Sequence, residues 1–184
     1  MRLAPLPYAA SRSILVQAPA ERIFVELVDF RRWRDWSPWE GVDPAMRRTY
    51  SGPKSGVGSW YAWDGNSKAG EGSMQITAVE PPRSVHIDLH FEKPFPADNR
   101  IRLDLEPQEP GSRYASESGS GPAADSGYGS GSRSDSGSST LVTWSMEGEH
   151  TGVMRVLGRV MSMDRLVGKD FEKGLARLKA LVER

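Results

Sequence analysis

Residues 164–184 read DRLVGKDFEKGLARLKALVER, and this stretch decides the fold. Its apolar residues recur every three or four positions, which is the period of an α-helix with one apolar face. These residues are Val167, Phe171, Leu175, Leu178 and Leu181 or Val182. Over residues 164–182 such a helix would be about 28 Å long. We therefore expect a C-terminal helical segment over 151–184, with a bend or a new start near Met163, whose apolar stripe covers another element.

Alternating apolar and polar residues upstream predict strands with one buried face and one wet face, which implies antiparallel pairing. The clearest example is 85–92, where Val85, Ile87, Leu89 and Phe91 alternate with polar residues. The same reasoning predicts strands at 14–16, 46–50, 57–64, 72–79, 101–105 and 140–147. Two short helices, one starting at Pro19 and one over 30–36, are expected after the first strand.

Residues 111–139 differ in composition from the rest of the chain. Seven glycines and eleven serines make up 18 of these 29 residues, and no aliphatic side chain is larger than alanine. Such a segment buries too little apolar surface to offset the entropy of ordering it. We interpret it as a flexible loop inserted between two strands of a single domain that spans 1–184. Replacing a four-residue turn by this loop costs about 2 kcal/mol of closure entropy, which a fold tolerates.

The overall composition excludes several classes of function. Lys and Arg number 24, as do Asp and Glu, so nothing favours a nucleic-acid or anionic-membrane partner. There is no cysteine, which excludes disulfides, thiolate catalysis and cysteine-ligated metals. No stretch approaches 18 apolar residues, and the N-terminus lacks the apolar core of a signal peptide. We therefore expect a cytoplasmic protein that does not insert into membranes.

Candidate metal ligands lie on one predicted strand. His86, Asp88 and His90 share a strand face, and a His-x-His pattern can bind a metal. The apolar residues Ile87 and Leu89 occupy the other, inner face, so the three polar side chains are expected to point to solvent. We predict no metal site and no cofactor.

A catalytic constellation is not evident from the residues. Asp64, Glu71 and Glu147 lie near predicted strand ends, but their parity places none of them securely inward. Neither a nucleophile elbow nor a phosphate-binding glycine loop occurs.

The order of elements is a strand, two short helices, about six strands and a long helix, which predicts an α+β helix-grip fold: a curved antiparallel sheet wrapped around the C-terminal helix. In this order the chain resembles the START-like (SRPBCC) superfamily, and within it the polyketide cyclase/dehydrase and lipid-transport group. Three stretches carry the resemblance: APAERIF (18–24) with DFRRWRDWSPW (29–39), GVG (56–58) through GEGSMQI (70–76), and VGKDFEKGL (167–175). The Gly/Ser-rich insertion departs from the pattern.

The resemblance implies a hydrophobic cavity between the sheet and the C-terminal helix, and the alternation of apolar residues predicts which side chains face it. The expected ligand-binding residues of the sheet are Tyr61, Trp63, Met74, Ile76, Ile87, Leu89, Phe91, Leu103 and Trp144. Those of the helical end are Met154, Leu157, Met161 and Phe171, with Leu166 beside them. Trp36 and Trp39 join them from an aromatic cluster that, with Trp33, forms either a lid over the cavity or a plug of the core.

The function that fits best is binding of a small hydrophobic or amphipathic molecule in this cavity. A cyclase- or dehydratase-like enzyme that uses the same cavity is an alternative, and it requires an ionisable group facing inward. A second alternative is a protein-binding, co-chaperone-like module, which would expose a contiguous patch around the three tryptophans or use the sheet edge.

Overall fold

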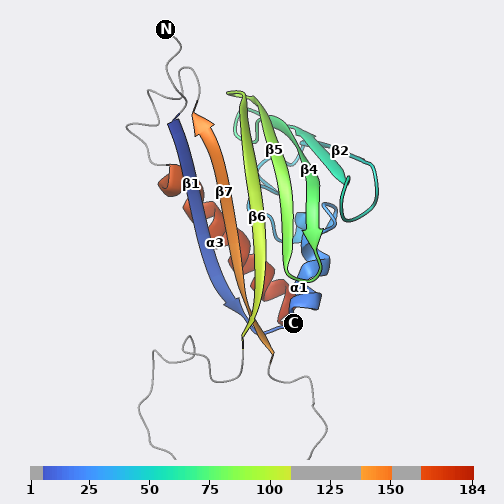
Figure 1. The fold of residues 1–184 in the computed structure, drawn as a ribbon. Helices are drawn as coiled ribbons and strands as arrows, with labels where there is room; N and C mark the ends of the chain where they lie inside the picture. Colours follow the sequence, from blue (N-terminus) through green and yellow to red (C-terminus); the bar gives the residue numbers. More distant parts are fainter. Residues whose placement is uncertain (1–5, 109–137, 151–162) are drawn as a thin grey trace, which may run out of the picture.

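The computed structural model describes residues 6–108, 138–150 and 163–184. Its sheet has seven antiparallel strands in the order β1-β7-β6-β5-β4-β3-β2 (Figure 1). The strands are β1 (Leu6–Val16), β2 (Arg47–Ser51), β3 (Trp60–Asp64), β4 (Glu71–Glu80), β5 (Ser84–Lys93), β6 (Ala97–Gln108) and β7 (Ser139–His150). The helices are α1 (Ala20–Leu27), the 3-10 helix η1 (Arg32–Asp35) and α3 (Met163–Val182). The predicted α+β helix-grip fold is confirmed.

The first strand is much longer than the sequence predicts. Strand β1 pairs along its whole length with β7, from Leu6 opposite His150 to Val16 opposite Thr140. The alternation fails to show this because the inner face carries Arg12, which bonds acidic residues of α3. A half-buried arginine on the inner face interrupts the apolar pattern, and only its partners explain its position.

Strands β6 and β7 are paired up to the predicted Gly/Ser-rich insertion, with Gln108 opposite Ser139. The predicted loop itself, except for residues 138 and 139, lies outside the described residues.

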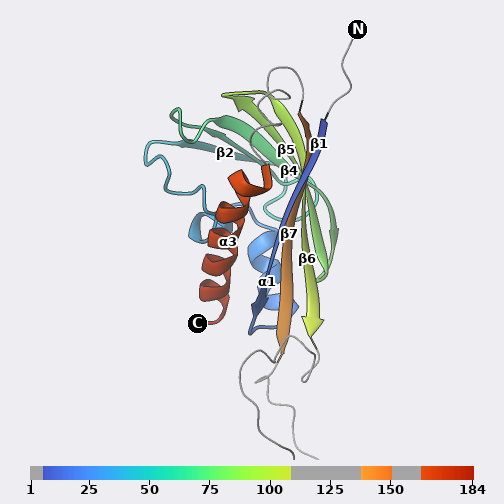
Figure 2. The same ribbon diagram turned by 90° about the vertical axis from the view of Figure 1, so that its left-hand side faces the viewer.

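Helix α3 lies on the concave face of the sheet (Figure 2). The predicted apolar stripe is the buried one: Phe171, Leu175, Leu178 and Val182 are at most 3% exposed. The ring of Phe171 stacks on that of Trp144 from β7, with centroids 4.6 Å apart and planes 7° apart. The segment 151–162, which the sequence predicts to be helical, lies outside the described residues. Within the described ranges, no helix is long and apolar enough to cross a membrane.

Gly174 allows this close approach of α3 to the sheet. A Cβ atom at this position would lie 2.9 Å from Pro38 Cδ and 2.9 Å from Trp144 Cζ3. Both are parts of rigid rings in the core, so neither can move aside easily.

We therefore predict that Gly174→Ala destabilises the protein, although alanine is the better helix former by about 1 kcal/mol. The forced shift of two packed rings should exceed that gain and lower the free energy of unfolding by about 1 kcal/mol or more. Urea denaturation measures the change, and Lys173→Ala, on the exposed side of the same turn, is the control. A stabilised Gly174→Ala variant would contradict the packing described here.

Polar contacts hold the N-terminal end of α3 to β1. Arg12 Nη1 donates to Asp164 Oδ1 at 2.6 Å, and Arg12 Nε donates to Glu172 Oε1 at 2.8 Å. Gly168 leaves the space for the guanidinium, because a Cβ there would collide with it. The hydrogen bond from Arg12 lowers the pKa of Asp164 below its ordinary value. This contribution to stability is therefore present above the unfolded-state pKa and is lost as the pH falls through the lowered pKa.

We predict that the stability difference between the wild type and Arg12→Gln is larger at pH 7 than at a pH well below 3.8, the ordinary pKa of Asp164. Urea denaturation of both proteins at each pH measures it, with Arg100→Gln on the exposed outer face of β6 as control. A difference that does not change with pH would show that the ion pair does not stabilise the attachment of α3.

Candidate functional site

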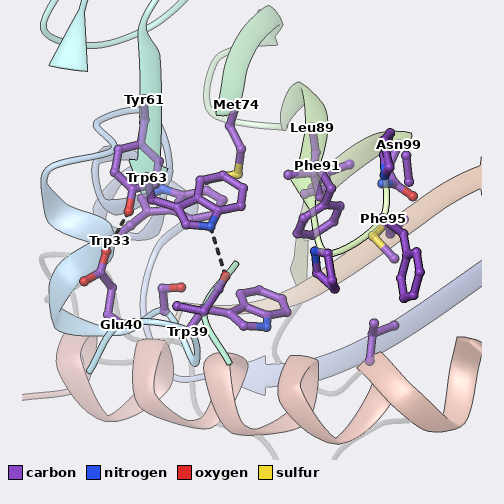
Figure 3. Close-up of a pocket in the computed structure, with 18 of the residues that line it drawn as sticks. Trp33, Trp39, Glu40, Tyr61, Trp63, Met74, Leu89, Phe91, Phe95 and Asn99 are labelled. Carbon is purple, nitrogen blue, oxygen red and sulfur yellow. Dashed lines mark hydrogen bonds between the residues drawn. The ribbon is translucent and has the colours of Figure 1, made fainter. Parts of the chain in front are cut away.

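A cavity of about 420 Å³ lies between the concave face of the sheet and the loop that follows η1 (Figure 3). The sequence predicts a cavity between the sheet and the C-terminal helix, but of the described residues of α3 only Val167 lines it. The size of the cavity falls within the range of about 300–1,000 Å³ that is typical of small-molecule sites. Aromatic side chains, methionines and prolines form most of its wall. The apolar lining residues are Trp33, Trp39, Met46, Tyr61, Trp63, Ala69, Met74, Leu89, Phe91, Pro94, Phe95, Pro96, Ala97, Ile101, Met146 and Val167. The polar ones are Tyr8, Ser37, Glu40, Asn99 and Glu149.

The cavity occupies one end of the sheet, whereas the inward side chains at the other end are buried in the core. On β5, Leu89 and Phe91 line the cavity, whereas Val85 and Ile87 are fully buried in the core. The neighbouring strands divide in the same way, and because they are antiparallel, the start of β6 lies beside the ends of β5 and β7. Side-chain alternation therefore predicts which face of the sheet a residue lies on, but not whether an inward residue lies in the core or lines the cavity.

The described residues that the sequence predicts to bind ligand fall into two groups, one at the cavity and one in the buried core. Six of them line the cavity: Trp39, Tyr61, Trp63, Met74, Leu89 and Phe91. Six others share the inner side of the molecule but pack in the fully buried core away from the cavity: Trp36, Ile76, Ile87, Leu103, Trp144 and Phe171. Met154, Leu157 and Met161, and the side chain of Leu166, lie outside the described residues.

A run of ring contacts leads from the buried core to the cavity wall. The rings of Trp36 and Trp144 lie 5.6 Å apart, and those of Trp33 and Trp36 lie 4.7 Å apart. From there the contacts continue through Phe30 to Tyr61, and from Tyr61 to Trp63 at 5.9 Å. Gly72 lets the Trp63 ring lie close to β4, since a Cβ there would be 2.7 Å from that ring.

The three tryptophans that follow α1 mostly fill the core. Trp33 and Trp36 are at most 3% exposed, and their ring N–H groups donate to the carbonyl oxygens of Leu27 and Glu26. Trp39, which is 39% exposed, is the member of the three that reaches the surface, and it also lines the cavity. The contiguous exposed patch that a protein-binding module would need is therefore absent at these residues.

Glu40, in one wall of the cavity, belongs to a buried ion pair with Arg48, which lies behind the wall. The carboxylate of Glu40 accepts hydrogen bonds from Arg48 Nε at 3.0 Å and from Arg48 Nη2 at 2.6 Å, and the two side chains are only 10% and 18% exposed. The hydroxyl of Tyr61 donates to Glu40 Oε1 at 3.2 Å (Figure 3). Burial raises the pKa of Tyr61, and the nearby carboxylate raises it further, so the phenol stays protonated at neutral pH.

A second polar pair lies on the side of the cavity formed by β1 and β6. The hydroxyl of Tyr8 donates to Asn99 Oδ1, and burial raises the pKa of Tyr8. Gly148 on β7 provides the room for this pair, because a Cβ there would collide with both side chains.

Sequence reasoning missed the polar residues of this wall. Glu40 lies in a loop, where strand parity offers no signal, whereas Asn99 continues the inner-face alternation of Ile101 and could have been found from it. Phe95 belongs to a proline-flanked turn between two strands and also carries no periodic signal.

The acidic residues that the sequence did single out are engaged elsewhere or exposed. Asp64 pairs with Arg47, Glu71 pairs with Lys93, and Glu147 is exposed. The predicted solvent-facing strand residues include His90, whose Nδ1 lies 2.6 Å from Asp98 Oδ1. In the ranges that the structure describes, no group of three or more His, Asp or Glu side chains could hold a metal ion.

These features define a helix-grip protein with an apolar cavity that has a charged group in its wall. Residues 8–183 match the family profile described as polyketide cyclase/dehydrase and lipid transport, and the chain belongs to this family. A search of curated proteins found no significant match.

Several solved structures share the fold. Truncated norcoclaurine synthase from Thalictrum flavum matches with a TM-score of 0.60 at 10% identity, over 99% of this chain and 97% of that chain. Protein CV1439 from Chromobacterium violaceum matches with a TM-score of 0.56 at 14% identity, over 96% and 97% of the two chains. The Aha1 dimer from Colwellia psychrerythraea matches with a TM-score of 0.53 at 16% identity, over 95% and 96%. At these identities the likeness concerns the fold.

We predict that Arg48→Met lowers the free energy of unfolding by about 3 kcal/mol, because it leaves the Glu40 carboxylate buried without its partner. The double variant Glu40→Met/Arg48→Met should recover most of this loss, since no buried charge then remains. Urea denaturation of the two single variants and the double variant measures the coupling. A double variant that loses as much as the two single variants together would contradict the description of Glu40 and Arg48 as one buried pair.

Proposed function

We propose that this protein binds a small apolar or amphipathic molecule in the cavity between the sheet and the loop that follows η1. The observation that carries the proposal is the wall itself: a space of about 420 Å³ beside the buried core, lined mainly by apolar side chains, many of them aromatic. A protein interior rarely leaves such a space unfilled, and apolar concave sites of this size are where small ligands bind.

Burial would supply the binding free energy. Removing about 300 Å² of apolar ligand surface from water contributes about 7 kcal/mol before the entropic costs of association. Methionine side chains such as Met74 and Met146 adapt to irregular ligand shapes, because they are unbranched and polarizable.

The comparisons support a ligand-binding function of this kind. The family description includes lipid transport. Another solved structure with this fold, norcoclaurine synthase from Thalictrum flavum, holds dopamine and hydroxybenzaldehyde, and it covers 97% of this chain with a TM-score of 0.59. The fold can therefore accommodate molecules of that size.

An enzyme that uses the same cavity is the second candidate, and one observation favours it. A cyclase or dehydratase needs a group that exchanges a proton with the substrate, and the Glu40 carboxylate with the Tyr61 hydroxyl on the cavity wall is such a group. The molecule that the protein releases distinguishes the two functions. A carrier releases its ligand unchanged, whereas an enzyme releases a product.

We predict that the wild type binds the uncharged fluorophore N-phenylnaphthylamine saturably at one site, with increased and blue-shifted emission. Met74→Trp should abolish this binding, because the larger ring enters the cavity from β4. The matched control is Gln75→Trp, which adds the same ring to the exposed face of the same strand and should bind as the wild type does.

Circular dichroism establishes that both variants fold. An absence of saturable binding by the wild type, or equal binding by Met74→Trp, would contradict the proposed function.

A further inference from the structure

The charged residues of the cavity wall all have the same sign. Of the described residues that line the cavity, Glu40 and Glu149 are acidic, and none is lysine or arginine. Glu149 is exposed, so its field is screened by solvent, whereas the Glu40 side chain is only 10% exposed. The buried charge that lines the cavity is therefore a carboxylate.

The cation that balances Glu40 does not line the cavity. Arg48 reaches Glu40 from β2, with its closest contact, 2.6 Å, to Oε2. The other oxygen, Oε1, accepts two longer hydrogen bonds: 3.2 Å from Tyr61, which does line the cavity, and 3.3 Å from Arg48 Nε. Both of these hydrogen bonds are longer than the 2.6 Å bond to Oε2, so Oε1 is the less tightly held oxygen, and a ligand ammonium group can compete for it.

Aromatic rings surround the same part of the cavity. Trp33, Trp39 and Tyr61 line it together with Glu40 and are drawn beside it in Figure 3. The face of an aromatic ring is electronegative and attracts ammonium groups, most strongly where water is excluded. Ring faces and a carboxylate oxygen favour the same kind of ligand group, and both disfavour an anion.

We infer that the cavity selects molecules that carry an ammonium group on a compact apolar body, with the ammonium beside Glu40 and Trp39, and that it discriminates against carboxylates such as fatty acids. This inference rests on the proposed function, since it concerns the ligand of the same cavity. The apolar body lies against the far wall, which Met74, Leu89 and Phe91 form.

Three compounds of nearly equal size test the inference: naphthalenemethylamine, naphthalenemethanol and naphthalenecarboxylate. Isothermal titration calorimetry at pH 7 measures the dissociation constant of each. The amine should bind about tenfold more tightly than the alcohol, which corresponds to about 1.4 kcal/mol of cation–π and carboxylate attraction. The carboxylate should bind more weakly than the alcohol.

The outcomes separate the inference from the function on which it rests. Binding of the alcohol without any preference for the amine, or tighter binding of the carboxylate, would overturn the inference and leave the proposed function intact. Failure of all three compounds to bind would overturn both.

Two variants test whether the preference for the amine arises at Glu40 and Trp39. Glu40→Gln should remove most of the preference for the amine while the alcohol still binds, and Glu147→Gln, on the outer face of β7, is the control with the same charge change. Because Glu40→Gln leaves Arg48 without its partner, Trp39→Leu provides a second test through the partly exposed ring. It should weaken binding of the amine more than that of the alcohol. Retention of the full preference in both variants would overturn the placement of the ammonium.

Discussion

The stacking of Phe171 on Trp144 is the contact on which the rest of the structure depends. It fixes α3 against β7, with ring centroids 4.6 Å apart, and Gly174 lies close to both the Trp144 ring and Pro38. Once these rings are in place, one end of the concave face is filled by the helix. The remaining end is covered by the loop after η1, whose side chains stand across from the sheet without filling the space. The cavity therefore exists because α3 covers only one end of the concave face and the loop does not fill the other.

The hydrogen-bonded group in and behind the cavity wall comes from three parts of the chain. Glu40 is in a loop, Arg48 is on the edge strand β2, and Tyr61 is on β3 next to it. Their mutual hydrogen bonds allow a charge to be buried in an aromatic wall at a tolerable free-energy cost. The solved structures share the fold at only 10–16% identity, so their likeness concerns the backbone and not the wall residues. The chemistry of the cavity is thus a property of this chain within a shared fold.

The fold could be predicted almost completely from the sequence, because alternation and helical period report directly which face of each element is buried. The buried stripe of α3 and the inner faces of β4 to β7 are examples. The site could be predicted only in part. The alternation puts Ile87 and Leu89 on the same face of β5, yet Ile87 lies in the core and Leu89 lines the cavity. The difference arises because α3 and the tryptophan rings cover one end of the strand and not the other, and the alternation does not report where they lie. Glu40 and Phe95 come from loops, where no periodicity exists, and the inward Arg12 is explained only by its partners on α3.

The central claim is that the cavity holds a small molecule, and native mass spectrometry of the freshly purified protein tests it most directly. The spectrum should show, beside the mass of the chain, a discrete adduct of a size that a cavity of about 420 Å³ can enclose. The adduct should disappear on denaturation and be absent from the protein in which Trp replaces Met74. An adduct that persists in that variant, or a wild-type protein that carries none and acquires none from added apolar amines and alcohols, would contradict the claim.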